Sequence, residues 1–405
     1  MPGVRLPSFR RLGRDAKLFI AEAAVSSLVW GAWWPISTLY LKEAGYTGTA
    51  LGTLGMVSGL TSVLSLPAGL VVDRFGRKRI LLLSWFASML GPVAVVLTTD
   101  LQSLLTAFLV SGVAGAALGP AYSALQAEAF EEDMESGYSL ESFVRSISSA
   151  AGGLVGWIPE SMAPSLGYLS AYRTTLIALL ALEAPSIVLL SLVRERYSPK
   201  ERAGISVRAR GVVARFAVTQ AVIGFGAGLS IPLIGYYLSV KFGVESGPIG
   251  TLFTVVSVVG GVSNLAAPAL SDRVGLLAGI LLPQAAAIPL LAAIPACPSF
   301  LCASLLYVPR TALMNMSNPL LWAFVMRVTP EEDRGAMSAV SQLAWNVPNS
   351  LSTQVGGWMM DSVGLDSPLL CTSAVYSIYL VVFYLLFRGF LHGEGEDPDG
   401  LHPPD

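Results

Sequence analysis

The sequence carries little charge for its length. Only 13% of its 405 residues are Asp, Glu, Lys or Arg, whereas 53% are hydrophobic. A soluble domain carries about 25% charged residues, so this chain has too few to cover a water-exposed surface. Apolar stretches of about 20 residues, the length needed to cross the hydrocarbon core of a bilayer, recur along the chain. The composition therefore predicts a membrane protein.

Histidine and cysteine are also scarce. The two histidines, His392 and His402, lie in the polar C-terminal tail, and the three cysteines form no CxxC pair. These residue types supply most zinc ligands and many catalytic groups. The GxxxxGK[ST] motif that binds nucleotide phosphates is absent as well. We therefore expect no metal site, no cofactor, no enzymatic activity and no ATP-driven pumping.

Twelve apolar segments are long enough to span the bilayer. We expect them to be helices, because lipid offers the backbone no hydrogen-bond partners. The predicted fold is thus an all-α membrane protein. The segments are 17–41, 49–72, 80–98, 102–126, 138–160, 169–193, 212–240, 247–270, 276–295, 299–326, 336–360 and 367–390.

The basic residues predict the orientation of the segments. If successive loops alternate between the two sides, 20 of the 25 Lys and Arg residues fall on the side that holds both termini. Basic residues are retained on the cytoplasmic side of membranes. We therefore expect a multi-pass protein of the cytoplasmic membrane with both termini in the cytoplasm. The N-terminal stretch has no small-residue cleavage site after a short apolar run, so we expect no cleaved signal peptide.

Four short matches relate the two halves of the chain at an offset of 199 to 201 residues, which indicates a tandem duplication. The predicted domains are an N-terminal six-helix half (1–193), a cytoplasmic linker (194–211), a C-terminal six-helix half (212–390) and a disordered tail (391–405). In order, the matches pair Asp73-Arg74-Phe75-Gly76 with Asp272-Arg273-Val274-Gly275, Pro120 with Pro319, Glu131-Glu132-Asp133 with Glu331-Glu332-Asp333, and Gly156-Trp157 plus Glu160 with Gly357-Trp358 plus Asp361.

The loop after the second segment carries the motif Gly69-Leu-Val-Val-Asp73-Arg74-Phe-Gly76-Arg77-Lys78. With this motif, twelve segments and a duplicated half, the chain resembles the major facilitator superfamily of transporters. The resemblance implies two pseudo-symmetric six-helix bundles that alternately open a central site to each side. Two motifs of its proton-coupled drug antiporters, a basic residue in the fourth segment and a GP motif in the fifth, are missing.

The resemblance also assigns a role to the charged loop. The basic residues are explained by orientation alone, but an acid at the C-terminal end of a helix needs a partner. We expect a cytoplasmic latch, closed only in the outward-facing state, in which Asp73 pairs with a nearby Arg or with one near the eleventh segment. The expected latch residues are Asp73, Arg74, Gly76, Arg77, Asp272 and Arg273.

Ionisable residues inside membrane segments are functional candidates. Arg145 and Arg310 lie in segments that line the cavity in the resembled family, and two cavity arginines would suit an organic anion. The alternative is that each pairs with protein, for example Arg145 with Glu22 or Glu128. The expected substrate cavity contains Arg145, Arg310, Asn315, Asn346, Asn349, Gln220 and Trp33.

Glu22 is the candidate for proton coupling, because burial raises the proton affinity of a carboxylate; a structural role is the alternative. The sequence thus favours a secondary active transporter of an organic anion, drug-like compound or metabolite, with or without proton coupling. A facilitative uniporter or a non-transporting sensor on the same fold stays open. We expect a monomer whose partners are a small solute, protons and the lipid bilayer, and not nucleic acid.

Overall fold

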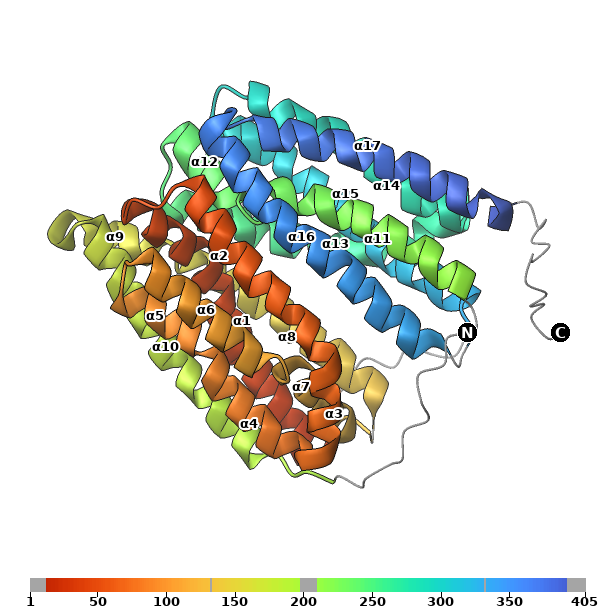
Figure 1. Cartoon of the computed structure of the whole chain (residues 1–405), viewed down its shortest axis with the longest axis horizontal. Helices are drawn as coiled ribbons and strands as arrows, with labels where there is room; N and C mark the ends of the chain where they lie inside the picture. The colour runs from red at the N-terminus through yellow and green to blue at the C-terminus, as the bar shows by residue number, and fades with distance from the viewer. Residues whose placement is uncertain (1–11, 132, 197–209, 331–332, 392–405) are drawn as a thin grey trace.

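The computed structural model describes residues 12–131, 133–196, 210–330 and 333–391, and every regular element in these ranges is a helix (Figure 1). The first half contains α1 (Arg14–Glu43), α2 (Gly48–Leu60), η2 (Thr61–Leu64), α3 (Ser65–Phe75), α4 (Arg77–Ser88), α5 (Leu90–Leu97), α6 (Leu101–Gly115), α7 (Leu118–Ala129), α8 (Met134–Leu154), α9 (Trp157–Leu166) and α10 (Tyr168–Leu192). The second half contains α11 (Arg210–Ser230), α12 (Ile234–Phe242), α13 (Ser246–Val274), α14 (Leu276–Ala293), η3 (Ile294–Ala296), α15 (Phe300–Val328), α16 (Arg334–Ser362), α17 (Ser367–Phe387) and η5 (Arg388–Leu391).

The helices coincide with the predicted apolar segments, each of which falls on one helix or on consecutive helices. Seven of the described helical stretches are long and apolar enough to cross a membrane. Large apolar side chains also face outwards, such as Leu97 at 70% exposure and Leu301 at 68%. An apolar exterior of this kind suits lipid rather than water. The chain is therefore a multi-pass membrane protein, and the crossing of the bilayer by all twelve segments stays a prediction.

Helix breaks follow from proline and glycine. α11 ends two residues before Pro232, whose ring removes a backbone donor and clashes with the preceding turn. Gly76 separates α3 from α4 at φ +93°, and Gly275 separates α13 from α14 at φ +85°. Glycine adopts this left-handed region without steric penalty. The last residue of the duplicated DRxG motif therefore makes the same sharp turn in both halves.

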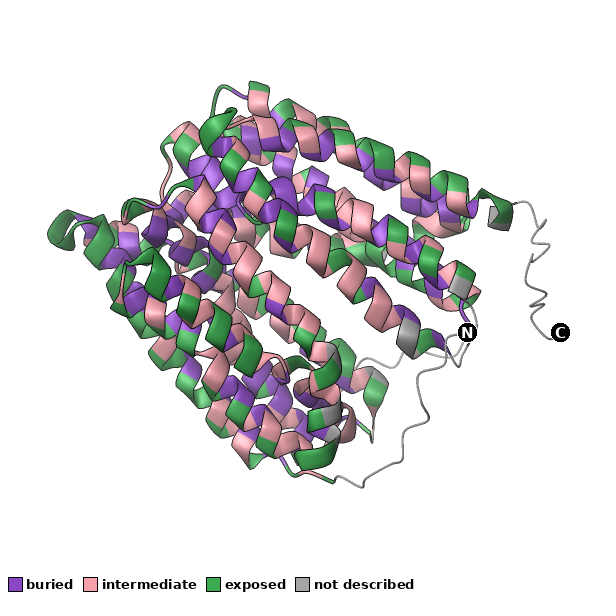
Figure 2. Ribbon diagram, in the orientation of Figure 1, coloured by how far each residue is buried: buried purple, intermediate pink, exposed green. Residues whose placement is uncertain are grey.

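The buried residues form one shared cluster and two separate ones. The shared cluster draws on both halves, with residues such as Tyr40, Tyr172 and Tyr237. A second cluster, around Phe216 and Phe383, belongs to the C-terminal half, and a third, around Phe19, belongs to the N-terminal half. Figures 1 and 2 show the halves joined where α1, α2, α12 and α16 meet and diverging toward the C-terminal ends of α3 and α17. We call these the closed end and the open end.

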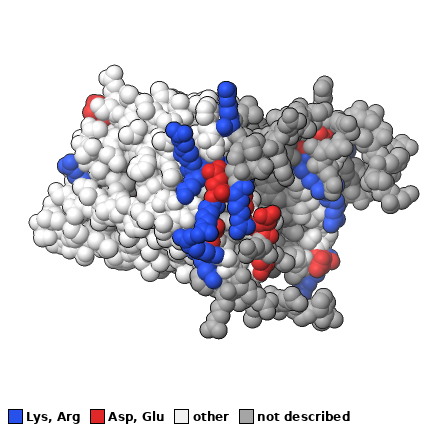
Figure 3. Space-filling model, turned by 90° about the horizontal axis from the view of Figure 1, so that it is seen from below, with Lys and Arg blue, Asp and Glu red and all other residues white. Residues whose placement is uncertain are grey.

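Charge is unevenly distributed over the face shown in Figure 3. Seen from below, a broad white area at the left has almost no charged side chain, while Lys and Arg gather with Asp and Glu in the middle and at the right (Figure 3). Most of the predicted linker (197–209) and tail (392–405) lies outside the described residues, so the domain boundaries stay predictions.

Candidate functional site

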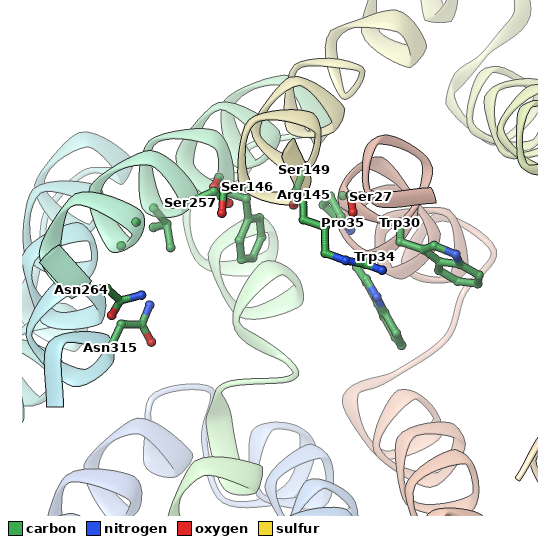
Figure 4. A pocket seen from close by; sticks show the side chains of 15 residues that line it. Ser27, Trp30, Trp34, Pro35, Arg145, Ser146, Ser149, Ser257, Asn264 and Asn315 are labelled. Carbon is green, nitrogen blue, oxygen red and sulfur yellow. The ribbon is translucent and has the colours of Figure 1, made fainter. Parts of the chain in front are cut away.

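A cavity of about 660 Å³ lies between the two halves (Figure 4). Both halves contribute to its wall, α1 and α8 from the first and α13 and α15 from the second. The lining residues are Ser27, Trp30, Gly31, Trp34, Pro35, Arg145, Ser146, Ser149, Phe253, Val256, Ser257, Gly260, Gly261, Asn264 and Asn315.

Close packing of α1 against α8 sets the position of Arg145. A Cβ atom on Gly31 would lie 2.5 Å from the backbone oxygen of Ser149, and one on Gly152 would collide with the backbone of Leu28. Glycines at these positions let the two backbones touch. Arg145, nearly two turns before Gly152 on α8, is thereby held beside α1 and reaches toward Trp34 (Figure 4).

The Arg145 guanidinium is the centre of a polar network. Its Nε donates to Glu141 at 2.5 Å, and its Nη2 donates to the Tyr122 hydroxyl at 2.6 Å. Tyr122 in turn donates to Glu22 at 2.7 Å, and the Glu22 carboxylate lies 4.0 Å from Arg145. The side chains of Glu22 and Glu141 are 5% and 7% exposed. Two buried carboxylates thus share one guanidinium. One of these two pairs, Arg145 with Glu22, is an alternative that the sequence analysis left open.

A second cavity of about 500 Å³ adjoins the first and shares Trp30, Trp34 and Arg145 with it. Glu22 and Glu183 line it. Glu183 on α10 is 2% exposed and accepts a hydrogen bond from Ser26 at 3.2 Å. The carboxylates of α1 and α10 therefore border a space that reaches the Arg145 network.

Of the predicted cavity residues, Arg145 and Asn315 line the main cavity. Arg310 is 4% exposed, and its guanidinium lies 5.6 Å from the ring centre of Tyr376 and 6.0 Å from that of Tyr307. Trp33 is 4% exposed in the shared cluster. These two side chains are packed among protein groups and are not among the residues that line the cavity.

The three remaining predicted amides lie around the contact between α11 and α16. Asn349 donates to the backbone oxygen of Gly224 at 3.2 Å and so joins the two helices. Asn346 is half-buried one turn earlier on α16, and Gln220 on α11 is 8% exposed. None of the three lines the main cavity.

The two cavities and the Arg145 network also contain residues that the sequence did not single out as site residues. Glu141 precedes Arg145 by one helical turn, and this i,i+4 spacing was a usable signal. Asn264 is an amide within an apolar segment, which was a second signal. Trp34 is 65% exposed beside the buried Trp33, and Tyr122 comes from another helix. No local pattern distinguishes those two residues.

At the closed end, an acid from each half caps a helix of the other half. Asp361 at the end of α16 accepts from the backbone nitrogens of Gly48 at 3.0 Å and Thr49 at 2.7 Å, at the start of α2. Glu160 in α9 accepts from the backbone nitrogen of Gly247 at 2.7 Å, at the start of α13. A helix N-terminus has unpaired N–H groups and a positive dipole end, so a carboxylate stabilises it. We call this duplicated pair the acid clamps.

Glycines next to the acid clamps bring helices of the two halves into backbone contact. A Cβ on Gly48 would lie 2.9 Å from the backbone oxygen of Gly357, and a Cβ on Gly250 would collide with the backbone oxygen of Gly153. The two contacts join α2 to α16 and α13 to α8. The closed end is therefore sealed by two equivalent interfaces, each with a glycine contact and an acid clamp.

The expected latch residues lie at the open end, and the structure leaves the latch untested. Asp73 is in the last turn of α3, and its side chain is not described. Arg77 makes an ion pair with Glu128 of its own half, and its backbone nitrogen donates to Glu195 at 2.6 Å. Three more expected latch residues, Arg74, Asp272 and Arg273, are exposed at the ends of α3 and α13, and the sixth, Gly76, is half-buried at the turn between α3 and α4.

Similar proteins share this architecture. The sucrose permease of Escherichia coli is 32% identical over 117 residues, a match that spans 28% of each chain. The structure of the nucleoside transporter NupG (D323A mutant) superimposes with a TM-score of 0.77 at 13% identity, covering 92% of this chain and 100% of that one. A bacterial homologue of the human lysosomal transporter Spinster, in an inward-facing and unoccupied conformation, superimposes with a TM-score of 0.73 at 13% identity, covering 96% and 98%.

A model of the Major Facilitator Superfamily matches residues 20–353, which is most of the chain. The match includes the charged loop after α3, the cavity helices α1, α8, α13 and α15, and most of α16. The resemblance seen in the sequence is thereby confirmed: the chain belongs to the Major Facilitator Superfamily.

Proposed function

We propose that this protein is a secondary active transporter that moves a small solute across the cytoplasmic membrane by alternating access. The observation that supports this most directly is a cavity between two halves that share a core at one end only. Two rigid halves with one sealed end form one of the two states that a rocking mechanism needs. The names of the relatives, a sucrose permease and a nucleoside transporter, agree with a small-solute cargo.

The orientation of this state follows from charge. The described helix ends that carry Arg77, Arg273 and Arg327 lie at the open end, and basic loops favour the cytoplasmic side. We therefore assign the described conformation as inward-open, with twelve transmembrane helices, cytoplasmic termini and halves 1–193 and 212–390 joined by the linker 194–211. In the outward-open state, the acid clamps break, and the loop carrying Asp73 closes against the other half as the latch.

The Arg145 network supports proton coupling through Glu22. One guanidinium balances only one of the two buried carboxylates, Glu22 and Glu141, so a proton on the second makes the cluster neutral. Glu22 also borders the second cavity. Rocking of the halves changes the side of the membrane to which the cavities open, and with it the side from which Glu22 can take up or release a proton.

Proteoliposome flux with an imposed pH gradient tests this proposal. We expect gradient-driven accumulation of solute by the wild-type protein. Glu22→Gln should retain solute exchange at equal pH and lose accumulation, because a neutral amide cannot carry the proton. Glu43→Gln, a change at an exposed carboxylate of the closed end, is the matched control and should behave as wild type.

The alternatives give different results in the same assay. A uniporter moves the solute at a rate that ignores the gradient, in the wild type and in both variants. A non-transporting sensor moves none. Either result would overturn secondary active transport by this chain.

A further inference from the structure

We infer that the transported solute is a neutral ring compound that carries several hydroxyl groups, and not an organic anion. This inference rests on the proposed function, because it assumes that the main cavity is the substrate site. Three properties of the described cavity wall lead to it: its charge balance, its hydrogen-bonding groups and the exposed indole of Trp34.

The first property is charge balance. Arg145 is the one charged residue among those that line the main cavity. Its guanidinium already contacts Glu141 at 2.5 Å and lies 4.0 Å from Glu22. An anion would have to compete with two carboxylates that are held at this guanidinium by the fold. A second arginine, Arg310, does not offset this, because it stacks against tyrosine rings away from the cavity wall.

The second property is a set of neutral hydrogen-bonding groups on the opposite wall. Asn264 from α13 and Asn315 from α15 point toward one another in Figure 4. Room for the Asn315 amide depends on Gly260, where a Cβ atom would lie 3.1 Å from the Asn315 Nδ2. An amide both donates and accepts, which matches a hydroxyl group. The other neutral polar residues of the wall are Ser27, Ser146, Ser149 and Ser257.

The third property is an exposed aromatic surface across from these amides. Trp34 is 65% exposed and lines both cavities together with Trp30. The two indoles are tilted at 43° with ring centres 6.4 Å apart. An indole face binds a flat or apolar ring face, whether of a base or of a sugar. A ring solute can therefore contact Trp34 on one face while its hydroxyls reach the amides.

The volume agrees with such a solute. Sites for small molecules have volumes of about 300–1,000 Å³, and the main cavity has about 660 Å³. Together the three properties select for a ring, for hydroxyl groups and against net charge. A sugar and a nucleoside share this chemistry, so the experiment must distinguish them.

The test compares binding within matched sets that differ mainly in charge. The purified full-length protein in lipid nanodiscs is titrated with glucose, sucrose, glucose 6-phosphate and glucosamine, and with uridine and uridine monophosphate, while tryptophan fluorescence is recorded. We expect one neutral family to bind at least about 10-fold more tightly than its charged members, a factor that corresponds to about 1.4 kcal/mol. If a charged member binds more tightly than the neutral members in every set that shows binding, the inference is overturned, and the same holds if no member binds.

Two variants then locate the binding. Trp34→Ala should weaken the neutral ligand about 10-fold, whereas Trp358→Ala, a control at an exposed indole on α16 outside the cavity, should not. Asn315→Asp should favour glucosamine over glucose and weaken the phosphate further, because it adds an unbalanced negative charge. A merely structural role for Asn315 would lower all affinities equally, and an equal loss would contradict the inference.

Flux separates this inference from the proposed function. The same compounds are tested in proteoliposomes. A charged member that binds and is carried would overturn the solute class and leave the transport proposal intact. A neutral member that binds at Trp34 and is never carried would overturn the transport proposal and leave the solute class intact.

Discussion

At the residue scale, the Arg145 network determines what the cavity can hold. Arg145, Glu141, Glu22 and Tyr122 come from α8, α1 and α7 and make a continuous set of hydrogen bonds. Because the carboxylates are buried, each depends on its partners for stability. The network is therefore both a structural element of the first half and the charged border of the site.

We predict that removal of the Arg145 guanidinium alone destabilises the protein more than removal of both this guanidinium and the Glu141 carboxylate. Arg145→Gln leaves two buried carboxylates without a cation, which should cost on the order of 2–3 kcal/mol after allowance for the partial exposure of Arg145. The double variant Arg145→Gln/Glu141→Gln should recover part of this loss. Thermal unfolding in detergent measures both. A double variant less stable than the single one would contradict the network as described.

At the scale of the elements, two interfaces seal the closed end: α2 packs against α16, and α13 packs against α8 and α9. Each interface has glycine at the backbone contact and a carboxylate at a helix N-terminus. The two interfaces are related by the internal duplication, since Gly156-Trp157 with Glu160 corresponds to Gly357-Trp358 with Asp361.

The acid clamps should set the population of the inward-open state. Asp361→Ala and Glu160→Ala each remove a helix-capping carboxylate, an interaction of about 1–2 kcal/mol. Each should increase labelling of a cysteine placed in the cavity by an impermeant reagent added at the closed end, by up to about 10-fold. The double variant should show the sum of the two free energies, because the clamps share no residue. Glu43→Ala, at an exposed acid of the same end, should leave labelling unchanged.

A side chain at a glycine contact should prevent closure altogether. A Cβ on Gly250 meets the backbone oxygen of Gly153, which cannot move aside as a flexible side chain would. Gly250→Leu should therefore hold the protein outward-open and abolish exchange while the protein stays folded. Gly119→Ala is the control, because nothing lies within 4 Å of its added Cβ. Normal exchange by Gly250→Leu would show that this contact is not part of the closed end.

At the scale of the whole molecule, the sequence predicted the family and the run of helices well. Both predictions depend on signals that can be read from a single sequence: the length of the apolar segments, the DRFGRK loop and the offset of about 200 residues between repeats. The cavity wall was harder to predict. The apolar residues of α1 are spread around its circumference and mark no single face, so the sequence could not show that Trp34 lines the cavity while Trp33 is buried in the shared core.

The same limit explains why the sequence did not show the packing of Arg310 against tyrosine rings. Its position in a cavity-lining segment predicted contact with solute, but Tyr376 of α17, distant in sequence, lies against it. Which face of a helix meets the cavity depends on the packing of neighbours, and no spacing within the helix records it. The acid clamps show a related limit. The sequence revealed Glu160 and Asp361 as members of a repeat, but it did not reveal that each contacts the opposite half.

The most direct test of the account is a pair of distances measured across the two ends of one molecule. Spin labels are placed at Thr99 and Val363 at the closed end, and in a second sample at Arg79 and Arg327 at the open end, with the native cysteines replaced by serine. When solute is added or the pH is changed, alternating access predicts that one distance lengthens as the other shortens. Two distances that stay fixed, or that lengthen together, while solute is carried would contradict it.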